Sequence, residues 1–133
     1  MIDILQVKQF QHEARVPVRV FELAGELDGS NFERFQEEVL QAIEAGTRYV
    51  VLDLSQLSYI SSAGLRALFR LAKALSAKGG ISTGSSNSNT SSFKSPYLKL
   101  FNPLPDVRRA LDVMGFSMSM EIYSDLNEVL ASF

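Results

Sequence analysis

The sequence predicts a single α/β domain, residues 1–133, with a mixed, mostly parallel β-sheet and packed α-helices. Three observations support this: strand-like segments alternate with helical ones, one central apolar run lacks polar alternation, and 133 residues suffice for one core. The expected order is β-β-α-β-α-β-α-β-α. Two consecutive strands at the start predict an antiparallel pair, and strands separated by helices predict parallel pairs.

The first three expected strands differ in their pattern. Residues 2–10 alternate loosely, whereas residues 16–28 alternate clearly between apolar and polar side chains, with Gly25 expected to end or bend the strand. Residues 49–54, "YVVLDL", are apolar and rich in β-branched residues without alternation. Such a strand is usually covered on both faces, so we expect it to be central in the sheet.

Two longer segments have the periodicity of amphipathic helices. Residues 30–46 place apolar side chains at helical spacing, and Ser30 with Glu33 matches a capping box, which predicts Ser30 as the cap. The second helix is expected from Ser62 to Ala77, with an apolar stripe that includes Leu65 and Leu68, and the following "KGG" ends it.

The last third of the chain begins with an unusual segment, about residues 80–96, dominated by Ser, Asn, Thr and Gly. It has too few apolar residues to order itself, so we expect a flexible loop. The elements expected after it are a strand at 97–101, a helix at 103–115, a strand at 119–123, and a helix at 124–133 with Ser124 as its N-cap.

The composition excludes several classes of function. Thirteen Lys and Arg against fifteen Asp and Glu give a net charge of −2, which argues against a nucleic-acid binder. The absence of cysteine excludes disulfides, thiolate metal sites and a cysteine nucleophile. The N-terminus lacks the long apolar core of a secretory signal, and no apolar run approaches the length of a membrane span. We therefore expect a cytoplasmic protein without membrane contact.

No pattern of catalytic or metal-binding residues emerges. His12 is the single histidine, "SSAGL" lacks the first glycine of a G-x-S-x-G elbow, and the Gly- and Ser-rich stretch lacks the G-K-[ST] ending of a phosphate loop. Asp53 is expected to cap the turn after the central strand, and the carboxylates show no metal-ligand spacing. We therefore predict no catalytic residue, no metal and no cofactor, and we expect that the protein is not an enzyme.

The stretch "LSYISSAGLRAL", residues 57–68, places two serines immediately before the second helix. The first turn of a helix leaves N–H groups unpaired, so a hydroxyl there either caps the helix or accepts a phosphate that the fold tolerates. Arg66 lies one turn beyond Ser62 and is able to pair with such a phosphate. Gly64 permits close packing or the close approach of another backbone.

Two motifs carry a resemblance to a known family. "VVLDLSQLSYISSAGLRAL" (50–68) and "LAGELDGSNF" (23–32) resemble the landmarks of STAS domains, in particular the bacterial anti-sigma factor antagonists. The resemblance, which extends over nearly the whole chain, implies the STAS fold and a phosphoacceptor serine. The family pattern Asp-Ser-Ser-Gly-Leu falls on Ser61–Leu65, so the acceptor position is Ser62, with Ser61 as the alternative. Ser61 replaces the usual aspartate, and Ala63 replaces the second serine.

The resemblance also implies partners and a function. The partners are an anti-sigma factor that is a serine-protein kinase, and a serine phosphatase that resets the switch. The residues expected to bind the partner are Asp28, Tyr59, Ser61, Ser62, Ala63, Gly64 and Arg66. Phosphorylation would end the binding. Alternatives are a STAS interaction module in another signalling or transport assembly, and a nucleotide- or small-molecule-binding STAS domain.

Overall fold

The structure is a computed structural model that describes residues 4–78 and 95–133. Five strands form one sheet in the order β1-β2-β3-β4-β5, in which β1 is antiparallel to β2 and the other neighbours are parallel. The strands are β1 Leu5–Glu13, β2 Pro17–Leu27, β3 Val50–Ile60, β4 Leu98–Phe101 and β5 Ile122–Tyr123. The predicted mixed, mostly parallel sheet is confirmed. Most of the expected loop at 80–96 lies outside the described residues.

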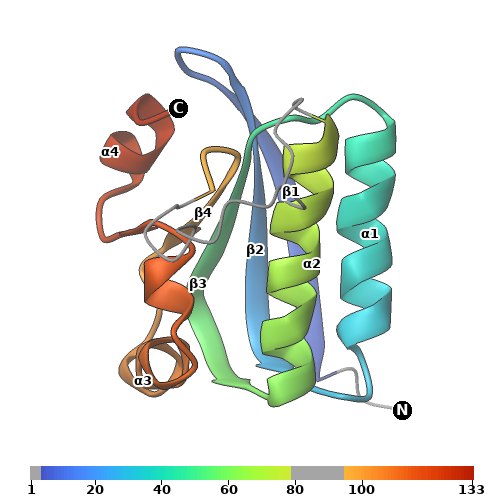
Figure 1. Cartoon of the computed structure of the whole chain (residues 1–133), viewed down its shortest axis with the longest axis vertical. Coiled ribbons are helices and arrows are strands. Elements are labelled where there is room, and N and C mark those ends of the chain that lie inside the picture. Colours follow the sequence, from blue (N-terminus) through green and yellow to red (C-terminus); the bar gives the residue numbers. More distant parts are fainter. Residues whose placement is uncertain (1–3, 79–94) are drawn as a thin grey trace, which may run out of the picture.

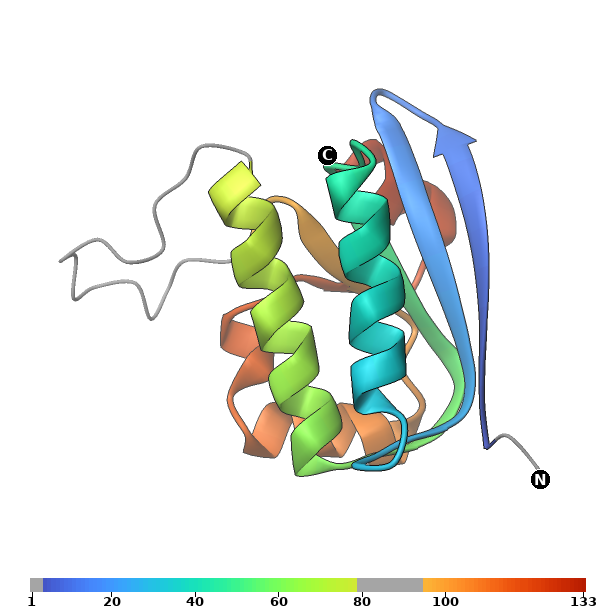
Figure 2. The ribbon, with the colours of Figure 1, turned by 90° about the vertical axis from the view of Figure 1, so that its right-hand side faces the viewer.

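Helices cover both faces of this sheet. They are α1 Phe32–Glu44, α2 Ser62–Lys78, α3 Pro105–Val113 and α4 Leu126–Ala131, with a short 3-10 helix, η2, at Phe116–Met118. In Figures 1 and 2, α1 and α2 lie side by side over one face, and α4 lies on the other. The arrangement explains why α1 and α2 each bury one apolar stripe while their opposite sides are polar.

The alternation of side chains along the strands builds two apolar layers. On β2, Phe21 and Leu23 point into the main core beneath α1 and α2, whereas Val20 joins a smaller cluster beneath α4. On β3, Leu52 belongs to the main core and Val51 to the smaller cluster, and both are fully buried. The central strand is therefore covered on both faces, as its unbroken apolar run predicted.

β3 continues six residues beyond the expected end of the central strand at residue 54 and ends at Ile60. Two register shifts against β2 accompany the extension, and Gly25 lies at the second with φ +108°. Gly25 therefore bends β2 without ending it. Asp53 lies inside β3, where its Oδ1 accepts hydrogen bonds from Ser55 N (3.0 Å) and Oγ (2.7 Å), so its predicted place at the strand end was wrong.

The predicted N-cap of α1 and the predicted N-cap of α4 were each wrong by one residue. Asn31 holds the N-cap position of α1, because the hydroxyl of Ser30 instead donates to Asp28 Oδ1 at 2.6 Å. At α4 the cap is Asp125, whose Oδ1 accepts from Glu128 N at 3.0 Å, while Ser124 precedes the helix. At α4 the neighbouring Asp125 takes the capping role expected of Ser124, whereas at α1 Asn31 occupies the N-cap position without a side-chain capping bond.

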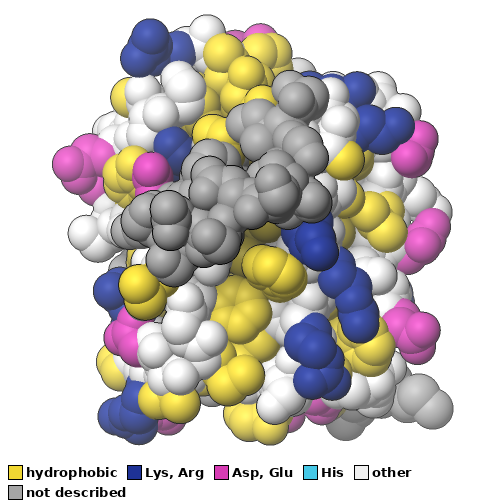
Figure 3. All heavy atoms as spheres, viewed as in Figure 1, with side chains coloured by type: hydrophobic (Ala, Val, Ile, Leu, Met, Phe, Trp, Pro, Cys, Tyr) yellow, Lys and Arg dark blue, Asp and Glu magenta, His cyan; other side chains and the backbone are white. Residues whose placement is uncertain are grey.

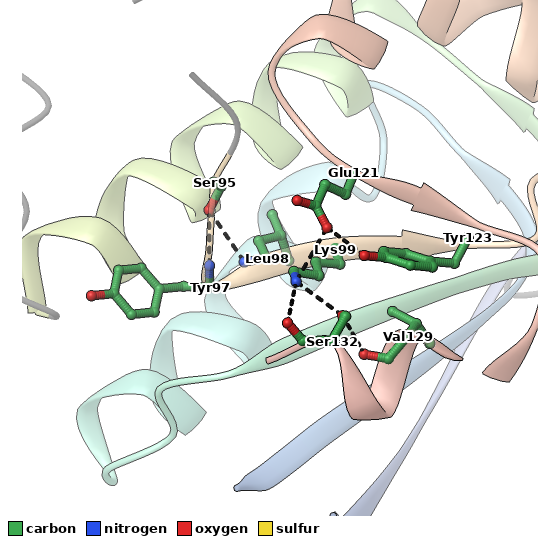
Figure 4. Close-up of polar contacts among 8 residues, drawn as sticks. All are labelled: Ser95, Tyr97, Leu98, Lys99, Glu121, Tyr123, Val129 and Ser132. Carbon is green, nitrogen blue, oxygen red and sulfur yellow. Dashed lines mark hydrogen bonds and ion pairs between the residues drawn. The ribbon is translucent and has the colours of Figure 1, made fainter. Parts of the chain in front are cut away.

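A buried lysine attaches α4 to the sheet (Figure 4). Lys99 on β4 is 4% exposed, and its Nζ donates to Ser132 O (3.0 Å) and Ser132 Oγ (2.9 Å) and lies 3.2 Å from Glu121 Oε1. The same Nζ lies 4.6 Å from the centre of the Phe133 ring. Tyr123 donates to Glu121 Oε1 at 2.6 Å, and this bond raises the pKa of the tyrosine.

We predict that Lys99→Ala lowers the free energy of unfolding by about 2–3 kcal/mol, because it removes a buried cation together with its part-buried bonds to Ser132 and its contact with Glu121. Urea denaturation of the two proteins measures this difference. Lys78→Ala is the control, since its ion pair with Glu44 (3.7 Å) is exposed and contributes less than about 1 kcal/mol. Equal losses for the two variants would contradict the importance assigned to Lys99.

Candidate functional site

The candidate site lies where β2 and β3 end side by side. Parallel strands bring their carboxyl ends to one edge of a sheet, where ligands and partners of open α/β sheets usually bind. Ser61 N donates to Leu27 O at 2.9 Å and joins the residue after β3 to the last residue of β2. This bond places the turn at Asp28 beside the start of α2 (Figure 1).

Gly64 makes this junction possible because it lacks a side chain. A Cβ atom at Gly64 would lie 2.9 Å from Leu27 Cγ and 2.9 Å from Ile60 Cγ1. It would also lie 3.1 Å from the carbonyl oxygen of Leu27. The first turn of α2 therefore packs directly on the end of β2, and the predicted close-packing role of the glycine is confirmed.

The two serines at the start of α2 have different surroundings. Ser61 holds the N-cap position, since its Oγ accepts from Gly64 N at 3.2 Å and its carbonyl accepts from Leu65 N at 2.9 Å. Ser62 is the first residue of α2 and is exposed. Its hydroxyl makes no hydrogen bond with any residue that the structure describes. Ser61 thus caps the helix, and the Ser62 hydroxyl is available at the surface.

The electrostatic setting of Ser62 favours an anion. The N-terminal end of a helix carries partial positive charge, and the first turn of α2 contains no acidic residue. Arg66 is exposed one turn further along, at the i+4 spacing that lets two side chains meet. Tyr59, which is 50% exposed, presents an aromatic ring near the end of β3.

The turn at Asp28 holds a charged carboxylate. Asp28 Oδ1 accepts from the hydroxyl of Ser30 at 2.6 Å and from its backbone N at 2.9 Å. These two bonds, the hydroxyl first, lower the pKa of Asp28 below its ordinary value because they stabilise the ionised form. Asp28 is therefore negatively charged near neutral pH at the edge where Ser62 is displayed.

Asn31 is the residue of this site that sequence reasoning missed. It is 6% exposed, its Nδ2 donates to Glu26 O at 2.9 Å, and its Oδ1 accepts from Asp28 N at 3.0 Å. One side chain thereby fixes both ends of the turn that carries Asp28. An Asn three residues after an Asp at a strand end is a turn signal that could have indicated it.

Basic side chains lie along α2 beyond Ser62. Arg66, Arg70 and Lys73 are all exposed, and Figure 3 shows Lys and Arg side chains in a row over this helix beside hydrophobic ones. Lys73 Nζ lies 5.4 Å from the centre of the Phe69 ring, which is itself 44% exposed. The edge therefore combines one fixed carboxylate, one free hydroxyl and a basic helix face.

The structure also limits other kinds of site. Within residues 4–78 and 95–133, no three His, Asp or Glu side chains are grouped closely enough to hold a metal ion. In the same residues, no helix has the length and apolar character needed to cross a bilayer. His12 pairs with Val18 near the start of β2, at the far end of the sheet from Leu27.

Comparison with known proteins identifies the family. The model of the STAS domain family matches residues 9–82. The chain belongs to the STAS domain family. A Bordetella bronchiseptica protein named "Putative anti-sigma factor antagonist BtrV" is 31% identical over 111 residues, which are 84% of this chain and 82% of that protein. The resemblance of the two motifs to STAS domains is thus confirmed, since the chain is a member of that family.

Solved structures show the same fold. An anti-sigma factor antagonist from Mycobacterium paratuberculosis has a TM-score of 0.71 at 16% identity, covering 96% of this STAS domain and 92% of that chain. The phosphorylated form of the Bacillus cell fate determinant SpoIIAA has a TM-score of 0.60 at 21% identity, covering 94% and 95%. The predicted fold class is therefore confirmed over almost the whole domain.

We predict that the two serines contribute differently to stability. Ser61→Ala removes the cap of α2 and lowers the free energy of unfolding by about 1 kcal/mol. Ser62→Ala removes an unbonded surface hydroxyl and changes it by less than about 0.5 kcal/mol. Thermal and urea unfolding of both variants measure this difference. A larger loss for Ser62→Ala than for Ser61→Ala would show that the assignment of the cap is wrong.

We predict that Ser30→Ala raises the pKa of Asp28 toward its ordinary value, because the hydroxyl bond that favours the carboxylate is lost. A titration of the Asp28 carboxyl carbon by NMR measures the change. Ser58→Ala is the control, since the Ser58 hydroxyl donates to Gly25 O and not to Asp28. An unchanged Asp28 pKa in Ser30→Ala would show that the Ser30 hydroxyl does not stabilise the carboxylate.

Proposed function

We propose that this STAS domain is an anti-sigma factor antagonist that binds an anti-sigma factor with serine kinase activity. Phosphorylation of Ser62 ends the binding, and a serine phosphatase restores it. The domain is the substrate of the kinase and needs no cofactor or metal of its own. The name of the Bordetella relative and the phosphorylated form of SpoIIAA, which has the same fold, support this proposal.

The observation that carries the proposal is the free, exposed hydroxyl of Ser62 on the first residue of α2. A kinase needs an accessible hydroxyl, and Ser62 offers one without the loss of any hydrogen bond within the described part of the chain. The cap belongs to Ser61, so it survives modification of its neighbour. The helix N-terminus also tolerates a phosphate electrostatically.

Phosphorylation then changes the charge of the edge while the fold is preserved. A phosphate adds about −1.5 to −2 charge units and three acceptor oxygens. It joins the carboxylate of Asp28 at the same edge, so a partner that places acidic or apolar groups there is repelled. Arg66 stabilises the phosphate by a charge-assisted hydrogen bond, which reduces the cation available to the partner.

The partner surface consists of the Asp28 turn, the exposed ring of Tyr59 and the first turn of α2. Ser61, Ser62 and Ala63 present their side chains or backbone on that turn, and Arg66 presents its side chain one turn further along. Gly64 is buried, so it contributes by seating α2 against Leu27 and not by direct contact with the partner.

The test combines phosphorylation and binding. The wild-type domain, Ser62→Ala and Ser61→Ala are incubated with candidate anti-sigma kinases and ATP, and the modified residue is mapped by mass spectrometry. We expect phosphate on the wild type and on Ser61→Ala but not on Ser62→Ala. Phosphorylation should weaken binding to the same kinase by roughly tenfold or more, which corresponds to about 1.4 kcal/mol.

Ser58→Ala is the matched control, since this exposed serine lies on β3 four residues before Ser62 and its hydroxyl is bonded to Gly25 O at 3.0 Å. It should be phosphorylated like the wild type. If Ser62→Ala is still phosphorylated and Ser61→Ala is not, the acceptor is Ser61. Binding that is equally tight with and without phosphate contradicts the proposed switch.

A further inference from the structure

A second polar feature lies at the opposite end of β2 and β3 from Ser62. It is a hollow of about 430 Å³ between the start of β2, the end of α1 and the connection from α1 to β3. Arg19 pairs with Val50 in this region, eight residues before Leu27 on β2, which is roughly 26 Å along an extended strand. None of the residues that line the hollow is Asp or Glu.

Arg19 is the unusual residue of this hollow. It shares the face of β2 with Phe21, so its side chain extends toward α1. Its Nε is buried and has no hydrogen-bond partner in the part of the chain that the structure describes. A guanidinium stays charged in proteins and carries five donors, and a buried donor without an acceptor is rare in native structures. Such a donor is available to an acceptor that enters the hollow.

Arg48 supplies a second, fixed guanidinium to the same hollow. Its Nη1 donates to Ile43 O at 3.0 Å and to Thr47 O at 2.9 Å, which are carbonyl groups at the end of α1 and just beyond it. These bonds fix the position of the side chain and offset the negative end of the helix dipole. No other donor of Arg48 is bonded to a described residue.

The surrounding acidic groups leave the two arginines uncompensated. Glu13 lies near the rim, where its Oε2 accepts from Gln11 Nε2 at 2.9 Å, and it forms no ion pair with Arg19 or Arg48. Glu44 at the end of α1 pairs with Lys78 at 3.7 Å. The hollow therefore presents two positive charges, the amide of Gln11 and the hydroxyl of Thr47.

We propose that this hollow binds a phosphate group, either as inorganic phosphate or as part of a small phosphomonoester. The planar guanidinium group of arginine matches the geometry of the phosphate oxygens. Hydrogen bonds between two charged groups are stronger than hydrogen bonds between neutral ones. The volume is within the range of small-molecule sites. The bound phosphate supplies the acceptor that Arg19 Nε lacks. The site is independent of the function proposed for Ser62, so either can fail without the other.

The test measures thermal unfolding of the full chain with inorganic phosphate against chloride at equal ionic strength. A ligand that binds only the folded state raises Tm with its concentration, by about 5 °C at roughly ten times its Kd for a domain of this size. Arg19→Met should keep the Tm of the wild type in chloride, since Nε gives up no bond, and should lose the rise with phosphate. Arg70→Met, on the exposed face of α2, is the matched control and should keep the rise.

NMR provides a readout that does not depend on stability. The Nε–H signal of Arg19 should shift in a saturable way with phosphate, and Arg48→Met should weaken the binding at least tenfold. Adenosine monophosphate tests the phosphomonoester: tighter binding than phosphate assigns the site to a larger ligand, and binding of phosphate alone assigns it to the free anion. No saturable shift with either probe, or an unchanged rise in Arg19→Met, overturns the proposal.

Discussion

The structure of the candidate site depends on one contact, the direct seating of α2 on the end of β2. The bond from Ser61 N to Leu27 O joins the ends of two parallel strands, and Gly64 lets the helix approach within van der Waals distance of Leu27. Because of this contact, the turn that carries Asp28 and the first turn of α2 form one surface. Any residue larger than glycine at position 64 would push these two segments apart.

The same contact assigns the capping of α2 to Ser61 and leaves the hydroxyl of Ser62 for the proposed phosphorylation. A phosphate on the capping hydroxyl of Ser61 would disturb its bond from Gly64 N, whereas a phosphate on Ser62 leaves that bond in place. The related family pattern has aspartate where this chain has Ser61, and aspartate caps a helix as well as serine does. The exchange therefore keeps the cap and removes one negative charge beside Ser62, the proposed acceptor.

The sequence predicted the layered fold, because alternation and helical periodicity are local signals, whereas the location of the functional site stays a prediction. It did not predict that β3 reaches Ile60. The buried residues Leu54, Leu57 and Ile60 are three apart, which hides the two-residue period of a strand. The register shifts against β2 explain the spacing, since each adds a residue to β3. The role of Asn31 was missed as well: the Asp-to-Asn spacing signals a turn, but the bonds of Asn31 to Glu26 and Asp28 depend on where the chain turns.

Two basic side chains, Lys99 and Arg19, differ in how the fold satisfies their hydrogen-bond donors. Lys99 has three donors and finds three oxygen partners, at Ser132 O, Ser132 Oγ and Glu121 Oε1, so its charge is fully used within the fold. Arg19 has a buried Nε with no partner among the described residues. Lys99 is buried and Arg19 half-buried, and the fold supplies partners for the Nζ of Lys99 but none among the described residues for the buried Nε of Arg19. An anion between Arg19 and Arg48 would remove this difference.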